Sequence, residues 1–234
     1  MLVYGRNVAI EYLQNKKEIQ KIWIQDSFND KKILSLIQNQ KTICKKCTKR
    51  ELDELANGVH QGIILEVEDY KYATFSDLLN HSDDNILIIL DHIEDPHNLG
   101  AIIRTCEAAG IDGIIIPKDR SATINATVLK TSVGTTENVK IAQVTNLVQA
   151  IADLKKEGYW IVGTDMINST NYREIDYSGK IAIIIGNEGS GMSRLVRKSC
   201  DFIARIPMYG KVNSLNASVS AGIMIYEVLR QKNK

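Results

Sequence analysis

Residues 180–191 read KIAIIIGNEGSG, a continuous apolar run that ends in a glycine-rich turn. A strand that is apolar at every position is buried on both faces, as parallel strands covered by helices are. Similar runs occur elsewhere in the second part of the chain: ILIILD (86–91), GIIIP (113–117), YWIVGTD (159–165) and FIARIP (202–207). Because helical stretches separate these runs, we predict an α/β domain built on a parallel sheet.

The first part of the chain alternates short β-rich runs with helical patterns. Strands are predicted at 19–25, 42–44 and 62–67, and a helix at 30–39. Thr48 and Glu51 form the pattern of a capping box, which predicts that a second helix, KRELDELA, begins there. These features indicate a small α/β unit. Polar residues collect between 68 and 85, where we place the domain boundary.

Composition excludes several classes of protein. Of the 234 residues 44% are hydrophobic and 24% charged, which is ordinary for a globular chain of one large or two small domains. No apolar run approaches the roughly 18 residues that span a bilayer, so we expect a cytoplasmic protein without membrane contact. Four cysteines are too few for a disulfide scaffold.

Charge gives only a local argument for nucleic acid. The net charge is +1, but residues 41–50, KTICKKCTKR, hold five positive residues and no acid. This stretch either follows a phosphate backbone or forms a solvated basic edge. Cys44 and Cys47 within it leave a zinc or redox protein as an alternative, although no second cysteine pair lies nearby and lysines flank the motif.

Ligands of open α/β sheets bind beyond the carboxyl ends of the strands, so the turns there are the first candidates for a binding site. After residue 91, Asn98 and Arg104 lie near the start of a helix. An asparagine can cap the helix, and an arginine can bind a phosphate through two parallel hydrogen bonds. The alternative is that the two residues are only an N-cap and a surface arginine without a ligand. The spacing of His92 and His97 fits no standard metal motif, so no metal is expected.

Two later turns are also rich in polar groups. The loop GNEGSG (186–191) matches neither phosphate-binding fingerprint, and Glu188 would favour a positively charged ligand or bind an arginine such as Arg104; the alternative is a plain turn. Residues 213–220 crowd asparagines and serines into one helix start, and the alternative there is a well-capped helix.

Taken together, these turns resemble the motifs of the SpoU (TrmH-like) family of RNA ribose methyltransferases, within the SPOUT class. The matching segments are LDHIEDPHNLGAIIRTCEAAG (90–110), IIIGNEGSGMS (183–193) and IPMYGKVNSLNASVSAGI (206–223). VYGRNVAIEYL (3–13) and HQGIILEV (60–67) resemble the ends of the small L30e-like RNA-binding domain of bacterial 23S rRNA guanosine methylases in this family. Departures are mild, such as Ser220 where alanine is usual.

The resemblance implies an L30e-like domain at 1–70, a linker at 71–85 and a SPOUT methyltransferase domain at 86–234, with a deep trefoil knot. Sequence rules treat knots as nearly absent, so the knot rests on the family alone. The implied cofactor is S-adenosylmethionine, the implied partner is RNA, and the implied assembly is a homodimer. The implied cofactor-binding residues are Gly186, Ile206, Met208, Ser214 and Leu215.

By the same resemblance the catalytic residues are Arg104, Asn98, Glu188, Ser214 and Asn216. Since arginine stays protonated in proteins, Arg104 is expected to orient the ribose hydroxyl and stabilise the developing alkoxide rather than act as a base. The expected reaction is methylation of a guanosine ribose in 23S rRNA. The alternatives are tRNA as substrate, and a non-catalytic RNA-binding factor for ribosome assembly.

Overall fold

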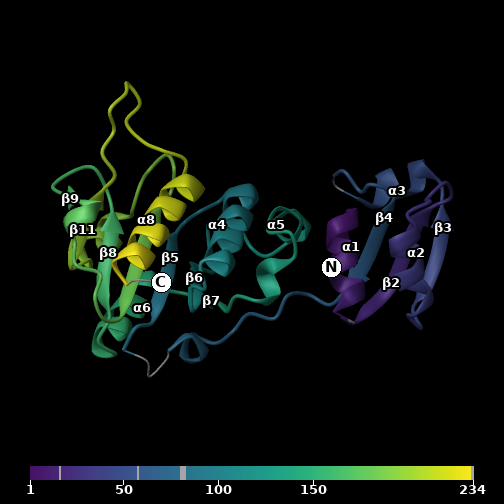
Figure 1. Ribbon diagram of the computed structural model, residues 1–234, viewed down its shortest axis with the longest axis horizontal. Coiled ribbons are helices and arrows are strands. Elements are labelled where there is room, and N and C mark those ends of the chain that lie inside the picture. Colours follow the sequence, from purple (N-terminus) through teal and green to yellow (C-terminus); the bar gives the residue numbers. More distant parts are fainter. Residues whose placement is uncertain (16, 57, 80–82, 233–234) are drawn as a thin grey trace. The chain divides into compact units, whose positions relative to one another are not determined.

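The apolar run at residues 180–186 forms β10 (Ile181–Gly186), the central strand of a seven-stranded sheet in the computed structural model (Figure 1). It pairs in parallel with β5 (Ile86–Asp91) on one side and with β8 (Trp160–Thr164) on the other. Every residue of β5 is buried, and so are the five isoleucine and alanine positions of β10. Burial of each such aliphatic side chain contributes about 1.5–3 kcal/mol, so these strands are the core of the sheet. The prediction of a parallel α/β sheet is confirmed.

The outer strands complete the order β7-β6-β5-β10-β8-β11-β9. They are β6 (Gly113–Pro117), β7 (Ile141–Val144), β9 (Thr170–Asn171) and β11 (Phe202–Arg205). All pairs in this sheet are parallel. The sequence analysis did not predict the edge strands β7 and β9, because β7 is only half apolar and β9 has two residues.

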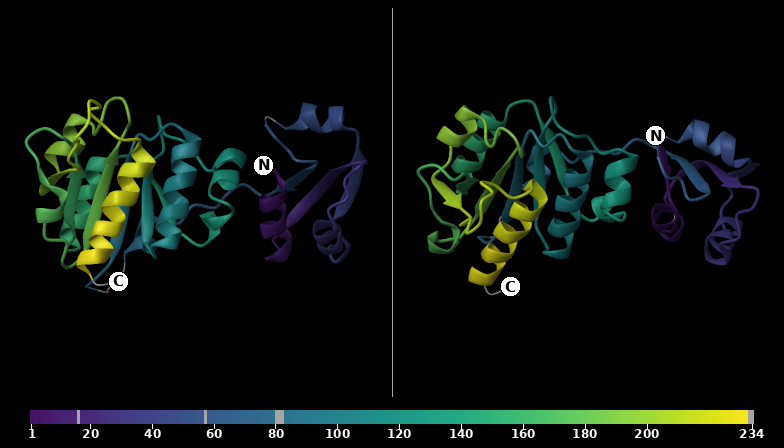
Figure 2. Two further views of the ribbon diagram at one scale, coloured as in Figure 1. Left: turned by 45° about the horizontal axis from the view of Figure 1, so that its top comes forward. Right: turned by 90° about the horizontal axis from the view of Figure 1, so that it is seen from above.

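Helices cover both faces of this sheet (Figures 1 and 2). On one face α4 (Pro96–Ala108) packs against α8 (Ala217–Gln231). On the other, α6 (Leu147–Lys156) and α7 (Arg194–Lys198) contribute Ile151 and Val196 to a core that contains Leu87 and Ile184. Short 3-10 turns lie at η1 (Phe75–Leu78), η2 (Thr135–Glu137) and η3 (Tyr172–Glu174).

A separate four-stranded sheet has the order β1-β4-β2-β3. Its strands are β1 (Leu2–Tyr4), β2 (Ile19–Gln25), β3 (Ile43–Cys47) and β4 (Ile63–Val67); its helices are α1 (Arg6–Gln14), α2 (Lys31–Gln38), α3 (Lys49–Leu55) and α5 (Ala126–Thr131). The predicted capping box is confirmed, because Glu51 N–H donates to Thr48 Oγ1 and Thr48 N–H donates to Glu51 Oε2. Leu52 of α3 and Ala126 of α5 pack with Trp23.

The structure describes residues 1–15, 17–56, 58–79 and 83–232, and the chain divides into two compact units. The first unit holds Met1–Lys71 and Ile124–Thr135, and the second Tyr72–Thr123 and Thr136–Lys234. The domain limits 1–70, 71–85 and 86–234 stay predictions, and residues 80–82 of that linker lie outside the described residues. Within the described ranges, no helix is both long and apolar enough to cross a membrane.

Candidate functional site

The site begins where β5 ends and α4 starts. Asp95, not Asn98, is the N-cap of α4: its Oδ1 accepts a hydrogen bond of 2.9 Å from the His97 N–H, and Pro96 is the first helical residue. Asn98 lies in the first turn of the helix and is 8% exposed. The alternative in which Asn98 caps the helix is therefore wrong, and its side chain is free for other partners.

Asn98 joins the second and third polar turns. Its Nδ2 donates to Oε1 of Glu188, in the loop after β10, and its Oδ1 accepts a hydrogen bond of 2.8 Å from Nδ2 of Asn216. Asn216 also caps α8, since its Oδ1 accepts from the Ser218 N–H at 2.9 Å. Three residues predicted from three separate turns thus form one chain of hydrogen bonds, which we call the Asn98 network.

The loop after β10 is closed on itself. Asn187 and Gly191 exchange backbone hydrogen bonds of 3.1 and 2.9 Å, and Asn187 Oδ1 accepts from the N–H groups of Gly189 and Ser190. Asn187 Nδ2 donates to the His92 carbonyl oxygen at 2.9 Å, which ties this loop to the turn after β5. These hydrogen bonds therefore fix the shape of the loop.

Gly186 shows why this loop needs glycine. A Cβ at this position would lie 2.5 Å from the Gly191 carbonyl carbon and 2.6 Å from the Met192 nitrogen. Both are backbone atoms and cannot turn aside. Only a residue without a side chain allows the returning loop to pass so close to the end of β10.

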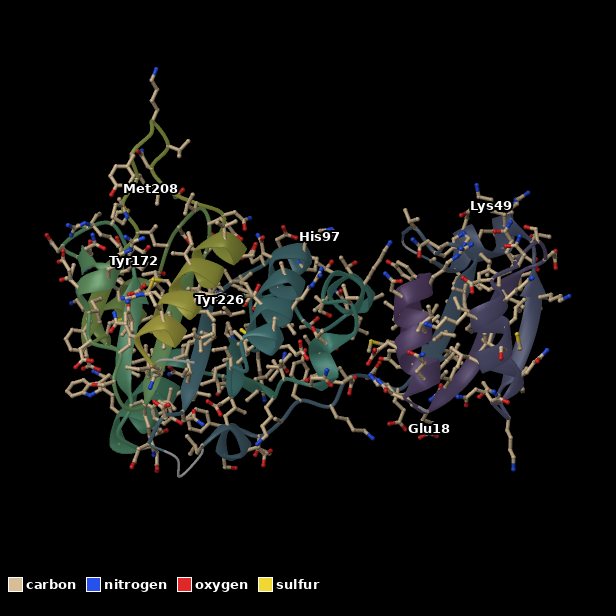
Figure 3. The ribbon with its side chains drawn as sticks, viewed as in Figure 1. Glu18, Lys49, His97, Tyr172, Met208 and Tyr226 are labelled. Carbon is tan, nitrogen blue, oxygen red and sulfur yellow. The ribbon has the colours of Figure 1, made fainter. Side chains whose placement is uncertain are left out.

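Beside this loop lies a cavity of about 390 Å³, which is in the size range of small-molecule sites. All five residues predicted to bind a cofactor line it: Gly186, Ile206, Met208, Ser214 and Leu215. Met208 is on the long loop between β11 and α8 (Figure 3). Of the predicted catalytic residues, Glu188 and Ser214 line the cavity, whereas Asn98 and Asn216 reach it through Glu188. The roles of these residues stay predictions.

A fourth turn lines the same cavity and was missed by the sequence analysis. It comprises Thr164, the last residue of β8, and Asp165, Met166 and Ile167, which follow that strand. The Asp165 carboxylate pairs with Arg197 Nε at 2.9 Å and also accepts from the Ile167 N–H, so it fixes the turn. The rule that ligands bind beyond the carboxyl ends of parallel strands could have found this turn, because Asp165 ends an apolar run.

Arg104 stands apart from the hydrogen bonds of the site. It lies on α4, and its side chain is exposed and makes no hydrogen bond or ion pair with any other residue that the structure describes. Glu188 binds Asn98 rather than Arg104, so the expected contact between Glu188 and Arg104 is not formed. The Arg104 guanidinium is therefore available to a bound partner.

The cysteine motif does not form a two-cysteine site. Cys44 and Cys47 are three residues apart on β3, so their side chains point to opposite faces of the strand. Cys44 is exposed and Cys47 is buried. Over the described ranges no group of three or more His, Cys, Asp or Glu side chains could hold a metal ion.

Two family models match the chain. Residues 85–226 match the SpoU rRNA Methylase family, and residues 2–73 match the model described as RNA 2'-O ribose methyltransferase substrate binding. A TrmH family tRNA/rRNA methyltransferase of Staphylococcus haemolyticus is 44% identical over 241 residues, which cover 100% of this chain and 97% of that protein.

Solved structures are similar as well. The SpoU methyltransferase AviRb from Streptomyces viridochromogenes, solved in complex with the cofactor AdoMet, superposes with a TM-score of 0.83 at 23% identity and covers 100% of this chain and 91% of its own. A TrmH/SpoU tRNA modifying enzyme of A. aeolicus has a TM-score of 0.60 and 33% identity, over 68% of this chain and 81% of its own.

Proposed function

This chain belongs to the SpoU rRNA methylase family of RNA 2'-O-ribose methyltransferases, and from that premise we propose that it methylates the ribose 2'-hydroxyl of a guanosine in 23S rRNA, with S-adenosylmethionine as the methyl donor. The observation that carries the proposal is the Asn98 network, which joins three polar turns beside one cavity. We place the reaction in the cytoplasm, where ribosomal RNA is available.

The cavity fits S-adenosylmethionine in size and in chemistry. Its volume of about 390 Å³ suits a ligand of this kind, and Ile206, Met208 and Leu215 offer apolar surface to an adenine ring. Glu188 at its rim adds negative charge, which suits a ligand with a positively charged sulfur. The relative that was solved with AdoMet supports the same choice of cofactor.

Bound S-adenosylmethionine supplies an electrophilic methyl group on a sulfonium. The residues of this chain position the acceptor against it, which can contribute about 7–11 kcal/mol to lowering the barrier. We assign the Asn98 network to holding the Glu188 loop and the start of α8 at fixed positions beside the cavity. Ser214, which lines the cavity, binds the cofactor or the reacting oxygen.

We assign Arg104 to the RNA. Its guanidinium keeps its proton, so it donates hydrogen bonds to a phosphate and stabilises negative charge on the 2'-oxygen as the O–H bond weakens. Its exposure and its lack of a partner among the described residues support this role.

Two further parts of the proposal rest on the family. The first is a deep trefoil knot formed by the last two motifs. The second is a homodimer. Val219, Ile223 and Tyr226 follow one stripe of α8, and Val219 and Tyr226 are 49% and 55% exposed. Figure 3 labels Tyr226 on this helix. We propose that a second copy of the chain covers this stripe.

The dimer can be tested by light scattering. Tyr226→Arg should convert the protein to monomers, whereas Leu195→Arg, which changes a residue 58% exposed on α7, should leave the dimer intact. A wild-type monomer that methylates RNA would contradict the arrangement.

The reaction itself is tested by transfer of a tritiated methyl group from S-adenosylmethionine to RNA. Mapping ribose methylation in RNA from cells that lack the protein then identifies the nucleotide. Loss of a modification from tRNA instead would favour the second candidate, which the tRNA modifying relative from A. aeolicus supports. Absence of any transfer would favour a non-catalytic assembly factor.

A further inference from the structure

A hollow of about 710 Å³ lies at one end of the four-stranded sheet in the first unit. The register of the sheet brings the ends of β1, β2 and β3 to the start of β4 here: Gln25 lies opposite Cys47, Ile24 opposite Ile63, and Tyr4 opposite Ile64. Helices α1 and α3 begin at the same end, with Arg6 and Lys49 as their first residues. Polar side chains from α1, β2, α3 and the turn before β4 therefore converge on the hollow.

His60 builds the hollow rather than binding a ligand. It is 6% exposed, and its Nδ1 accepts a hydrogen bond of 2.9 Å from the Gly62 N–H. The proton of the ring is therefore on Nε2, which donates to Asp53 Oδ1 at 2.9 Å. This hydrogen bond holds the carboxylate of Asp53, the acidic side chain that lines the hollow. It also fixes the turn that carries Gln61.

Two glutamine side chains line the hollow, and in each of them one amide atom forms a hydrogen bond and the other does not. Gln61 has a φ of 52°, which is rare for a residue with a side chain and costs energy, and its Oε1 accepts from the Arg6 N–H at 2.8 Å. Its Nε2 has no partner among the described residues. Gln25 is complementary: its Nε2 donates to Ser27 Oγ at 2.9 Å, and its Oε1 has no partner within the same ranges.

Positive charge lies beside these amides. Lys49 is exposed and forms no ion pair with any residue the structure describes; its side chain lies at this end of the sheet (Figure 3). The Arg6 guanidinium lies 3.6 Å from an Asp30 oxygen and 5.5 Å from the centre of the Phe28 ring. Its charge is partly balanced by Asp30, so Lys49 is the main free cation of the hollow.

We propose that this hollow binds one unpaired nucleotide of the RNA substrate, with a backbone phosphate on Lys49 and the edge of the base between the free amide groups of Gln25 and Gln61. Proteins read single-stranded RNA by such contacts with splayed bases, since an amide donor and an amide acceptor together match the edge of a base. The proposal rests on the proposed function, in which the substrate is RNA.

The charges favour RNA over a free nucleotide. A phosphodiester carries one negative charge, which one lysine balances, whereas the monophosphate of a free nucleotide carries nearly two. Lys49 also belongs to the basic stretch 41–50, in which Lys45 and Lys46 are exposed on β3. Because neighbouring residues of a strand point to opposite faces, one of these two lysines offers a contact for a phosphate that flanks the bound nucleotide.

The test is binding of a fluorescent, unstructured RNA 12-mer of mixed sequence to the full chain, measured from 50 to 300 mM salt. Lys49→Ala should weaken binding about three- to tenfold and reduce the slope of log affinity against log salt by about 0.7, the loss of one phosphate contact on a single strand. Lys31→Ala is the matched control, because Lys31 is also exposed and is the first residue of a helix, α2. It should change neither quantity.

A second pair of variants tests the base contact. Gln25→Met keeps the length of the side chain and removes the amide, so it should weaken binding about fivefold without changing the salt slope. The control is Gln20→Met, because Gln20 is an exposed residue of the same strand β2 and does not line the hollow. It should not change the affinity for the RNA. The unfolding temperature of each of the four variants is measured as a control, and values close to that of the wild type show that the variant folds.

Three results would overturn the proposal: equal effects of Lys49→Ala and Lys31→Ala, equal effects of the two glutamine variants, or binding of GMP that depends on Lys49 while binding of the 12-mer does not. Methyl transfer to transcribed 23S rRNA separates this failure from failure of the proposed function. If wild-type protein transfers no methyl group but its RNA affinity still depends on Lys49, the proposed reaction is wrong and the hollow is a nucleotide site. If transfer occurs and Lys49→Ala does not raise the KM for RNA above that of Lys31→Ala, only the hollow is rejected.

Discussion

Asn98 and Asn216 are joined by a hydrogen bond of 2.8 Å across a sequence separation of 118 residues. Asn98 holds the amide of Asn216 with its oxygen and the carboxylate of Glu188 with its nitrogen, so a single side chain fixes two loops. The Asn98 amide is available for both bonds because Asp95, and not Asn98, caps the helix.

Asn98→Ala removes both bonds at once. We expect kcat/KM for methyl transfer to fall about 100-fold, because loops that are misplaced by about an ångström lose positioning of the reactants. The control is Asn138→Ala, which removes a surface hydrogen bond from Asn138 to Glu107 in the same unit and should leave the rate unchanged. Full activity of Asn98→Ala would show that the network is not needed for positioning.

Arg104→Ala should reduce kcat about 100- to 1,000-fold, the usual cost of losing a group that stabilises developing negative charge. Binding of S-adenosylmethionine, measured by calorimetry, should stay nearly unchanged, because Arg104 does not line the cavity. Arg194→Ala is the control, since Arg194 is also exposed and lies at the start of α7. Equal activity of the two variants would reject the role of Arg104.

Gly186→Ala should abolish cofactor binding and lower the free energy of unfolding by about 1–3 kcal/mol, because its Cβ meets backbone atoms of the returning loop. Gly210→Ala is the matched change in the loop before α8, where a Cβ would meet nothing within 4 Å. Denaturant unfolding and calorimetry measure both effects. An unchanged affinity in Gly186→Ala would mean that the loop after β10 does not contact the cofactor.

The ionised Glu227 side chain should contribute to the free energy of unfolding in a way that depends on pH. Hydrogen bonds from Arg230 Nη2 at 2.7 Å and Nε at 2.9 Å lower the pKa of Glu227, with a further bond from Gln231. A lowered pKa stabilises the fold above the unfolded value of about 4.3, and this stability is lost as pH falls through the folded value. Urea unfolding at pH 7 and at about pH 3.5 should therefore show a smaller acid loss in Glu227→Gln than in wild type. Glu157→Gln, at an exposed position, should keep the wild-type loss.

The thiols predict one reactive cysteine. Cys44 is exposed, Cys47 and Cys106 are buried, and burial raises the pKa of the half-buried Cys200 to about 12. Ellman's reagent should titrate one thiol in native protein and four after unfolding. Because desolvation by neighbouring groups also raises the pKa of the Cys44 thiol, its rate of reaction should increase with pH above 8. Cys44→Ser should remove the native reaction, and two fast thiols in wild type would show that one of Cys47, Cys106 and Cys200 is more accessible than the structure indicates.

Much of the site follows from one rule. Parallel strands that are apolar throughout end at a common edge, so the residues after β5, β10 and β11 could be grouped before any coordinates were known. The assignment of Gly186 and Leu215 to one cofactor site came from the resemblance to a family and not from this rule, and both residues line the cavity. Residues 164–167 were not assigned to the site, because the resemblance names no residue there, although Asp165 ends an apolar run and the rule of strand ends points to it.

Other features depend on tertiary contacts that local patterns do not encode. The N-cap of α4 could be Asp95 or Asn98 by residue type, and packing of Asn98 between two loops decided between them. The packing of α5 with the first sheet is a second case, since its six residues are preceded and followed by strands of the other sheet.

The return of residues 124–135 to the first unit bears on how the protein is made. During translation the four strands of the first sheet leave the ribosome within the first 67 residues. Ala126, which packs against the core cluster that contains Tyr4, and Lys130, whose Nζ lies over the Tyr4 ring, emerge much later. The amino-terminal unit therefore cannot complete its core until β5, α4 and β6 have also been synthesised.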